Sequence, residues 1–145
     1  MTLTVVRTLC VENFPGSLTR SAIMENLEMI VRRLNREDIV GELWLDGSFL
    51  TVKIDPGDVD YVLRVSSSLY DWNTTKQAVI DWASHRDLKE SHSCDAYKWV
   101  EYSSGHPMFA VSENDRVFWT NLFGKSHIGG VPKGIAVVSL PAELK

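Results

Sequence analysis

Residues 39–63 read IVGELWLDGSFLTVKIDPGDVDYVL, and this stretch decides the fold that the sequence predicts. Its first seven residues are rich in β-formers and lead into Asp46-Gly47, a dipeptide that a two-residue hairpin turn favours because both residues adopt positive φ. Pro56-Gly57 marks a second turn. The stretch therefore predicts three consecutive antiparallel strands.

The two turns also set a register, because a one-residue slip would turn every side chain to the other face. In this register one face is apolar, and Trp44, Phe49 and Arg64 form a row on the opposite face. Aromatic residues and arginine are enriched at protein interfaces. We call this opposite face the mixed face, and its candidate partner-binding residues are Glu42, Trp44, Phe49, Lys53, Asp60 and Arg64.

Working outward, two segments have helical patterns. After Ser17 the apolar residues recur with a helical period, which predicts a strongly amphipathic helix; they are Ile23, Met24, Leu27, Ile30, Val31 and Leu34. A second helix is predicted to begin near 73–75, where Thr74 and Gln77 fit a capping box, and to run towards Leu88.

Further strands are predicted from β-branched and aromatic residues at 2–11, 95–103, 107–111, 116–123 and 134–140. The stretch from Ser112 to Phe123 equally fits a helix that Ser112 would cap. The predicted fold class is α+β, with a mainly antiparallel sheet of five to seven strands packed against the amphipathic helix and a second helix elsewhere.

Length and composition predict one folded domain spanning residues 1–145. Hydrophobic residues make up 44% of the 145 residues and charged residues 23%, so a disordered chain does not fit. No apolar stretch has the length of a membrane span and no secretory signal stands at the start, so a cytoplasmic protein is expected. Cys10 and Cys94 are expected to be reduced and buried.

Charge is distributed unevenly along the chain. The net charge is −4, from 15 basic and 19 acidic residues, which argues against broad binding to duplex DNA or other nucleic acid. Residues 37–60 hold seven acids against one base, Lys53, a local net charge of −6. This acidic stretch favours a basic protein partner.

No cofactor, metal site or catalytic residue is predicted. His92, Cys94 and His106 are ligand types that suit zinc, but their spacing lacks the two close pairs of structural zinc sites. Nucleophilic catalysis by Cys94 would need a positioned base and a third, orienting group, which these neighbours do not supply.

Two other patterns have a structural interpretation. Asp55, Asp58 and Asp60 surround the Pro56-Gly57 turn, where aspartate side chains cap local backbone amides, so turn formation is favoured over paired-carboxylate chemistry. The segment 125–134 holds three glycines, two lysines and a histidine; it is predicted as a flexible loop rather than an anion cradle.

The leading functional hypothesis is a noncatalytic protein that recognises a protein partner through the mixed face, as inhibitors, immunity proteins, adaptors and chaperones do. One alternative is a small-molecule-binding domain or small enzyme whose pocket is lined by Tyr97, Trp99, Tyr102, His106 and Trp119. A second alternative is a homo-oligomer that uses the same sheet face.

Overall fold

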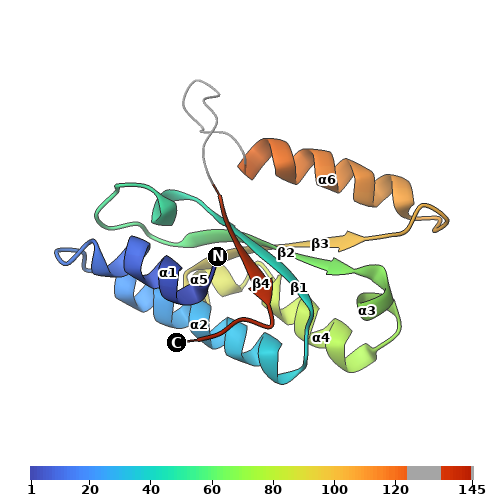
Figure 1. The fold of residues 1–145 in the computed structure, drawn as a ribbon, viewed down its shortest axis with the longest axis horizontal. Coiled ribbons are helices and arrows are strands. Elements are labelled where there is room, and N and C mark those ends of the chain that lie inside the picture. The colour runs from blue at the N-terminus through green and yellow to red at the C-terminus, as the bar shows by residue number, and fades with distance from the viewer. Residues whose placement is uncertain (124–134, 145) are drawn as a thin grey trace.

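The computed structural model describes residues 1–123 and 135–144 and has an α+β architecture, as predicted (Figure 1). Within this part of the chain a single four-stranded sheet has the order β3-β2-β1-β4. β1 is antiparallel to β2 and β4, whereas β2 and β3 are parallel. The predicted sheet of five to seven mainly antiparallel strands is therefore corrected to a mixed sheet of β1 (Gly41–Asp46), β2 (Val59–Ser66), β3 (Cys94–Glu101) and β4 (Ala136–Leu140).

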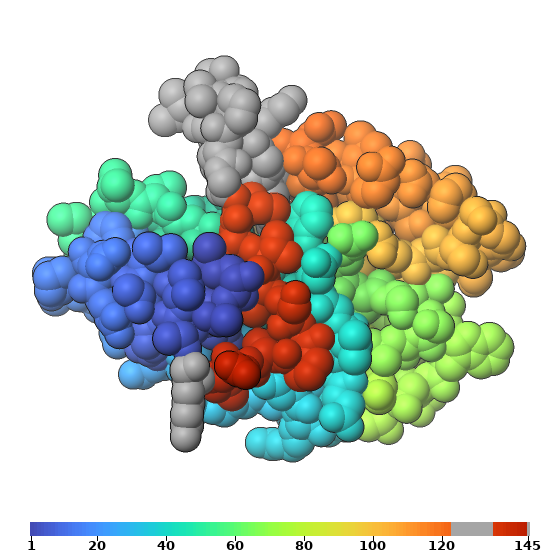
Figure 2. All heavy atoms as spheres, viewed as in Figure 1, coloured from blue at the N-terminus to red at the C-terminus, as the bar shows by residue number. Residues whose placement is uncertain are grey.

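Helices cover both faces of this sheet. Figure 1 shows α6 on one face, and α1, α2, α4 and α5 on the other. In Figure 2, β4 lies at the surface beside α1, and the Met1 ammonium donates a hydrogen bond to the Val137 carbonyl (2.9 Å). The helices are α1 (Leu3–Arg7), α2 (Arg20–Arg36), α3 (Ser67–Asp71), α4 (Thr74–Ala83), α5 (Leu88–His92) and α6 (Phe109–Phe123), with a π-helical turn η1 (Thr8–Glu12) and a 3-10 turn η2 (Ser48–Leu50).

The two predicted helices are confirmed as α2 and α4, but α4 is capped by Asn73 instead of a Thr74–Gln77 capping box and ends at Ala83 instead of running towards Leu88. Met24, Leu27 and Ile30 on α2 have no exposed surface and form the centre of the core beneath the sheet. Burying each such side chain stabilises the fold by roughly 2 kcal/mol. At the start of α4, the Asn73 side chain accepts a hydrogen bond from the Lys76 amide (2.9 Å) and caps the helix.

The strand predicted at 2–11 is wrong, because this segment is helical. Thr2 accepts a hydrogen bond from the Val5 amide (3.2 Å) and caps α1. Leu3, Val6 and Cys10 then follow one another at helical spacing, and all three are buried in the main core. Docking of this apolar stripe outweighs the strand preference of its β-branched residues.

The predicted three-stranded meander is also wrong, because β1 pairs directly with β2 and residues 51–58 form a loop. Trp44 lies opposite Val62 instead of Phe49. Val52 and Ile54 belong to the apolar face of the predicted register, yet they are 87% and 58% exposed. The carbonyls of Phe49, Thr51 and Lys53 accept hydrogen bonds from a buried arginine of α2, so they are not available for a strand partner.

The strands predicted at 107–111 and 116–123 are replaced by the single helix α6, and the helical alternative starting at Ser112 had the correct element type. Helices α3, α4 and α5 connect β2 to β3, and such a crossover makes a parallel pair possible. The loop predicted over 125–134 lies outside the described residues. None of the helices described is long and apolar enough to cross a membrane.

Candidate functional site

Strand register brings aspartates together at one end of the sheet. Asp46 on β1 lies opposite Asp60 on β2, and Asp60 lies beside Asp95 on β3. Residues in register on neighbouring strands share a face of the sheet, so three carboxylates lie in one row across three strands. Asp58 comes two residues before Asp60, at the entrance to β2. We call Asp46, Asp58, Asp60 and Asp95 the acidic row.

The acidic row lies on the face of the sheet that α6 covers. Val62 on the next row of the same face packs with Trp99 and with Trp119 of α6 in a small buried cluster. Asp46 is 2% exposed, and the other three aspartates are half-buried. The row therefore lies at the end of a covered surface and is partly open to solvent.

The carboxylates of the acidic row repel one another. Burial, followed by the charges of Asp58, Asp95 and Asp46, raises the pKa of Asp60 to about 6. Lys89 acts in the opposite direction, with its Nζ 3.6 Å from Asp58 Oδ2. Like charges directly opposite each other destabilise a sheet, so this row opposes folding unless a cation neutralises it.

A glycine turn packs against the row. Gly47 follows Asp46 with φ at 87°, a conformation that L side chains rarely adopt. A Cβ at this position would collide with the Asp60 carboxylate. Ser48 then begins the η2 turn, in which the Leu50 amide donates to the Gly47 carbonyl (3.1 Å). Glycine is therefore required here by both its backbone angle and its contact with Asp60.

An aromatic surface adjoins the other end of the row. The Tyr97 hydroxyl donates to Asp95 Oδ2 (3.2 Å), and the tyrosine is 40% exposed. Its ring centroid is 5.1 Å from that of Trp119. The site thus combines several carboxylates, a tight glycine turn and a partly exposed aromatic ring.

No three carboxylate, thiolate or imidazole side chains in the described residues are arranged to hold a metal ion by themselves. Magnesium rarely uses a cage made entirely of protein ligands: it takes one or two carboxylates and completes its shell with water and substrate phosphates. The acidic row therefore suits a cation that arrives together with a phosphate ligand.

The structure brings together three of the six predicted partner-binding residues. Arg64 donates to Glu42 (2.8 Å) and its guanidinium lies 5.7 Å from the centre of the Trp44 ring. Trp44 is half-buried and packs edge-on against Trp99, with 5.3 Å between ring centroids. The charged and aromatic groups of this cluster therefore have their main partners within the molecule.

The other three predicted partner-binding residues lie elsewhere. Phe49 has no exposed surface and belongs to the main core, because it sits in the η2 turn instead of in a strand. Lys53 is in the exposed loop after that turn. Asp60 shares the face with Trp44 but lies at the acidic row. The mixed face as predicted therefore does not exist as one surface.

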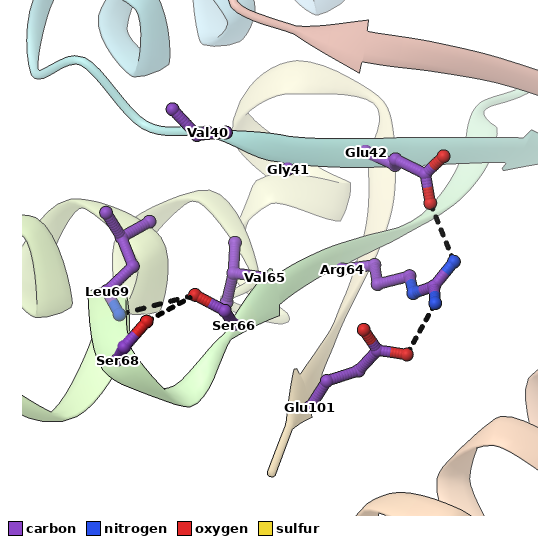
Figure 3. Close-up of a pocket in the computed structure, with 9 residues that line it drawn as sticks. All are labelled: Val40, Gly41, Glu42, Arg64, Val65, Ser66, Ser68, Leu69 and Glu101. Atoms are coloured by element: carbon purple, nitrogen blue, oxygen red, sulfur yellow. Dashed lines mark hydrogen bonds and ion pairs between the residues drawn. The ribbon is translucent and has the colours of Figure 1, made fainter. Parts of the chain in front are cut away.

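A hollow of about 460 Å³ lies at the opposite end of the same face, and Figure 3 shows the residues that line it. Arg64 lies on its wall between Glu42 and Glu101, with 2.5 Å from its Nη2 to Glu101 Oε1. Two carboxylates already neutralise this guanidinium. The hollow therefore offers little to an anionic ligand; it is lined by Val40, Gly41, Glu42, Arg64, Val65, Ser66, Ser68, Leu69 and Glu101.

The five residues predicted to line an aromatic pocket divide into two groups. Trp99 and Trp119 are buried together, with Tyr97 against them. Tyr102 and His106 instead pair with each other, 4.4 Å between ring centroids, and His106 Nε2 lies 3.7 Å from an Asp71 carboxylate oxygen. The two groups do not form the single pocket that was predicted.

Cys94 is fully buried beneath the sheet, and burial raises the pKa of its thiol to about 12. A thiol with such a pKa is protonated at neutral pH and is a poor nucleophile. His92 lies half-buried with its ring 6.1 Å from the Trp82 ring.

As parts of the acidic row, Asp46 and Asp95 were missed by sequence reasoning. Asp58 was interpreted as a turn residue, and Asp60 as a turn residue and a candidate partner-binding residue. A signal was present in the sequence. Aspartate is depleted in strands, yet Asp46, Asp60 and Asp95 each stand beside apolar residues that form strands. An aspartate in a strand indicates that the residue has a role other than forming the strand.

The chain belongs to a family of unknown function, DUF6932, whose model matches residues 1–139. No curated protein and no solved structure matches the chain. The comparisons therefore assign no activity, ligand or partner.

Proposed function

We propose, for this member of a family that carries no assigned activity, that the acidic row binds a divalent cation together with a nucleoside triphosphate and supports group transfer from it. The observation that carries the proposal is the register of Asp46, Asp60 and Asp95, which aligns three carboxylates on three adjacent strands beside the Gly47 turn. This proposal corresponds to the small-enzyme alternative, but its site is the acidic row and not the predicted aromatic pocket.

The chemistry follows from charge. A triphosphate and an acidic row repel each other, and only a divalent cation shared between them makes their association favourable. Asp58, Asp60 and Asp95 are half-buried, and one or two of these carboxylates would supply oxygen ligands to the cation, with phosphates and water as its other ligands. When bound, such a cation would supply positive charge to offset the charge that develops on the phosphate during transfer.

The proposed step is a displacement at phosphorus. An acceptor hydroxyl oxygen forms a bond to a phosphorus of the triphosphate, and the bond from that phosphorus to the bridging oxygen of the leaving group breaks. The acceptor proton passes to a carboxylate oxygen of the row or to solvent. Attack at the α-phosphorus releases pyrophosphate, and attack at the γ-phosphorus releases the nucleoside diphosphate.

The test is calorimetric titration with ATP, GTP, CTP and UTP, each in the presence of Mg²⁺ and again in EDTA. We expect binding that needs Mg²⁺ and that Asp58→Asn, Asp60→Asn and Asp95→Asn each weaken about tenfold or more. Glu25→Gln, which removes an exposed carboxylate on α2, is the matched control and should bind like the wild type.

Nucleotides labelled at the α- or γ-phosphate then identify the phosphorus attacked, since the two labels leave in different products. Absence of Mg²⁺-dependent binding of all four nucleotides to the wild type would overturn the proposal. Equal binding by wild type and the three aspartate variants would show that nucleotides bind elsewhere.

The second candidate function is recognition of a basic protein partner by this protein, which we propose to be cytoplasmic. It is favoured by the half-exposed cluster of Glu42, Trp44 and Arg64 and by the acidic residues of 37–60. Pull-down with Trp44→Ala and Arg64→Ala should then lose a basic partner that Trp72→Ala, at an 86% exposed tryptophan, retains. Light scattering over a range of concentrations separates this function from self-association.

A further inference from the structure

Arg20, the first residue of α2, is a charged side chain with no exposed surface. Its guanidinium donates four hydrogen bonds, all to backbone carbonyls. Nη1 donates to Cys10 (2.9 Å) and Phe49 (2.6 Å). Nη2 donates to Thr51 (2.7 Å) and Lys53 (2.5 Å). Burial of a cation opposes folding unless its hydrogen bonds are made, so the arrangement points to a specific role for this arginine.

Three of the four acceptors belong to one loop. The loop runs over 47–58 and joins the Gly47 turn at one end to Asp58 at the other. A second attachment lies nearby, where Asp55 Oδ1 accepts hydrogen bonds from the Leu18 amide (2.7 Å) and the Ser17 hydroxyl (3.2 Å). The start of α2 therefore holds the loop along its length.

We propose that Arg20 is the positioning residue of the acidic site: it fixes the course of the 47–58 loop, which places the Gly47 turn against Asp60 at one end and leads into Asp58 at the other. This inference rests on the proposed function, because the geometry matters to the ligand only if the ligand binds there. Arginine is required because its planar fork reaches separate carbonyls from two nitrogens, whereas lysine donates from one point.

A substitution at Phe14 provides a second way to perturb the Arg20 guanidinium. The Arg20 guanidinium lies 3.8 Å from the centre of the Phe14 ring, which covers one face of the planar cation. Phe14→Leu removes this aromatic face while all four hydrogen bonds can persist. It is therefore the milder variant, and it keeps the proposal testable if an Arg20 variant fails to fold.

The experiment compares Arg20→Lys and Phe14→Leu with Asn35→Ala. Asn35 is a matched control on the same helix, because its side chain also ties a distant segment to α2 through two hydrogen bonds with Ala142 (2.7 and 3.0 Å). Titration with Mg²⁺ and ATP measures affinity, and hydrogen exchange of amides 49–55 measures the order of the loop. All measurements are made at a temperature at which each variant is folded by circular dichroism.

We expect Arg20→Lys to weaken MgATP binding by about tenfold to a hundredfold, in proportion to faster exchange in the loop, and Phe14→Leu to do so less. Asn35→Ala should leave both quantities unchanged. The inference is overturned if the loop exchanges faster in Arg20→Lys but MgATP binds as in the wild type, or if the loop is unaffected. If the wild type itself shows no Mg²⁺-dependent binding, the proposed function fails and this inference fails with it, an outcome that is distinct from the first two.

Discussion

Replacing Asp60 with asparagine should stabilise the folded protein at neutral pH. In the folded state, burial and then the charges of Asp58, Asp95 and Asp46 raise the pKa of Asp60 from 3.8 to about 6. The folded protein thus retains a proton that the unfolded chain releases between these two pH values. Wild-type stability falls as pH rises through this window, because the carboxylate must then be charged in an unfavourable place.

The magnitude follows from the pKa change. A rise from 3.8 to about 6 corresponds to at most about 3 kcal/mol above pH 6. Because Asp60 is only half-buried, solvent screening reduces this to roughly 1–2 kcal/mol. The asparagine side chain carries no charge at any pH, so the substitution should raise the melting temperature by about 3–8 °C at pH 7.5.

The assay is thermal and urea unfolding of wild type and Asp60→Asn in EDTA at intervals from pH 4 to pH 8. The advantage of the variant should be absent below pH 4, should grow between pH 4 and 6, and should be constant above. Glu25→Gln, at an exposed carboxylate of α2, should give a small difference without this dependence. A variant no more stable than wild type at pH 7.5, or an advantage independent of pH, would refute the electrostatic account of the acidic row.

Three further outcomes can be checked. Gly47→Ala should lower the free energy of unfolding by about 1–3 kcal/mol in urea titrations, because the new Cβ meets the Asp60 carboxylate at a positive φ; unchanged stability would contradict this turn geometry. Cys10 and Cys94, both buried with pKa values raised chiefly by burial, should resist Ellman's reagent at pH 8 in the native protein and react fully in denaturant. Leu27→Ala should destabilise the protein by about 3 kcal/mol, since it opens a cavity at the centre of the core; a loss below about 1 kcal/mol would mean that the helix is not packed as described.

The elements that local sequence predicts correctly are those whose pattern agrees with their final packing. The apolar stripe around Met24 and Leu27 has a helical period, and the same residues face the sheet in the structure. The strands at 39–45, 95–103 and 134–140 correspond to β1, β3 and β4. In each of these segments, local preference and tertiary contacts favour the same conformation.

The errors occur where tertiary contacts oppose local preference. The segment 2–11 is β-branched, but burial of Leu3 and Val6 in the main core favours a helix. The residues after Gly47 alternate as a strand would, yet Arg20 binds their carbonyls and holds them as a loop. Neither effect is visible from neighbouring residues, because the contacts come from elements that are distant in sequence.

The acidic site likewise depends on contacts between elements that are distant in sequence. Sequence alone determined that aspartates gather in 37–60 and that Asp58 and Asp60 stand two residues apart. Only the tertiary structure placed Asp46 opposite Asp60 and brought in Asp95 from a strand that a helical crossover makes parallel. Strand register is a pairing between distant segments, whereas composition and periodicity are local, and for this reason the chain alone showed the charges but not the row that they form.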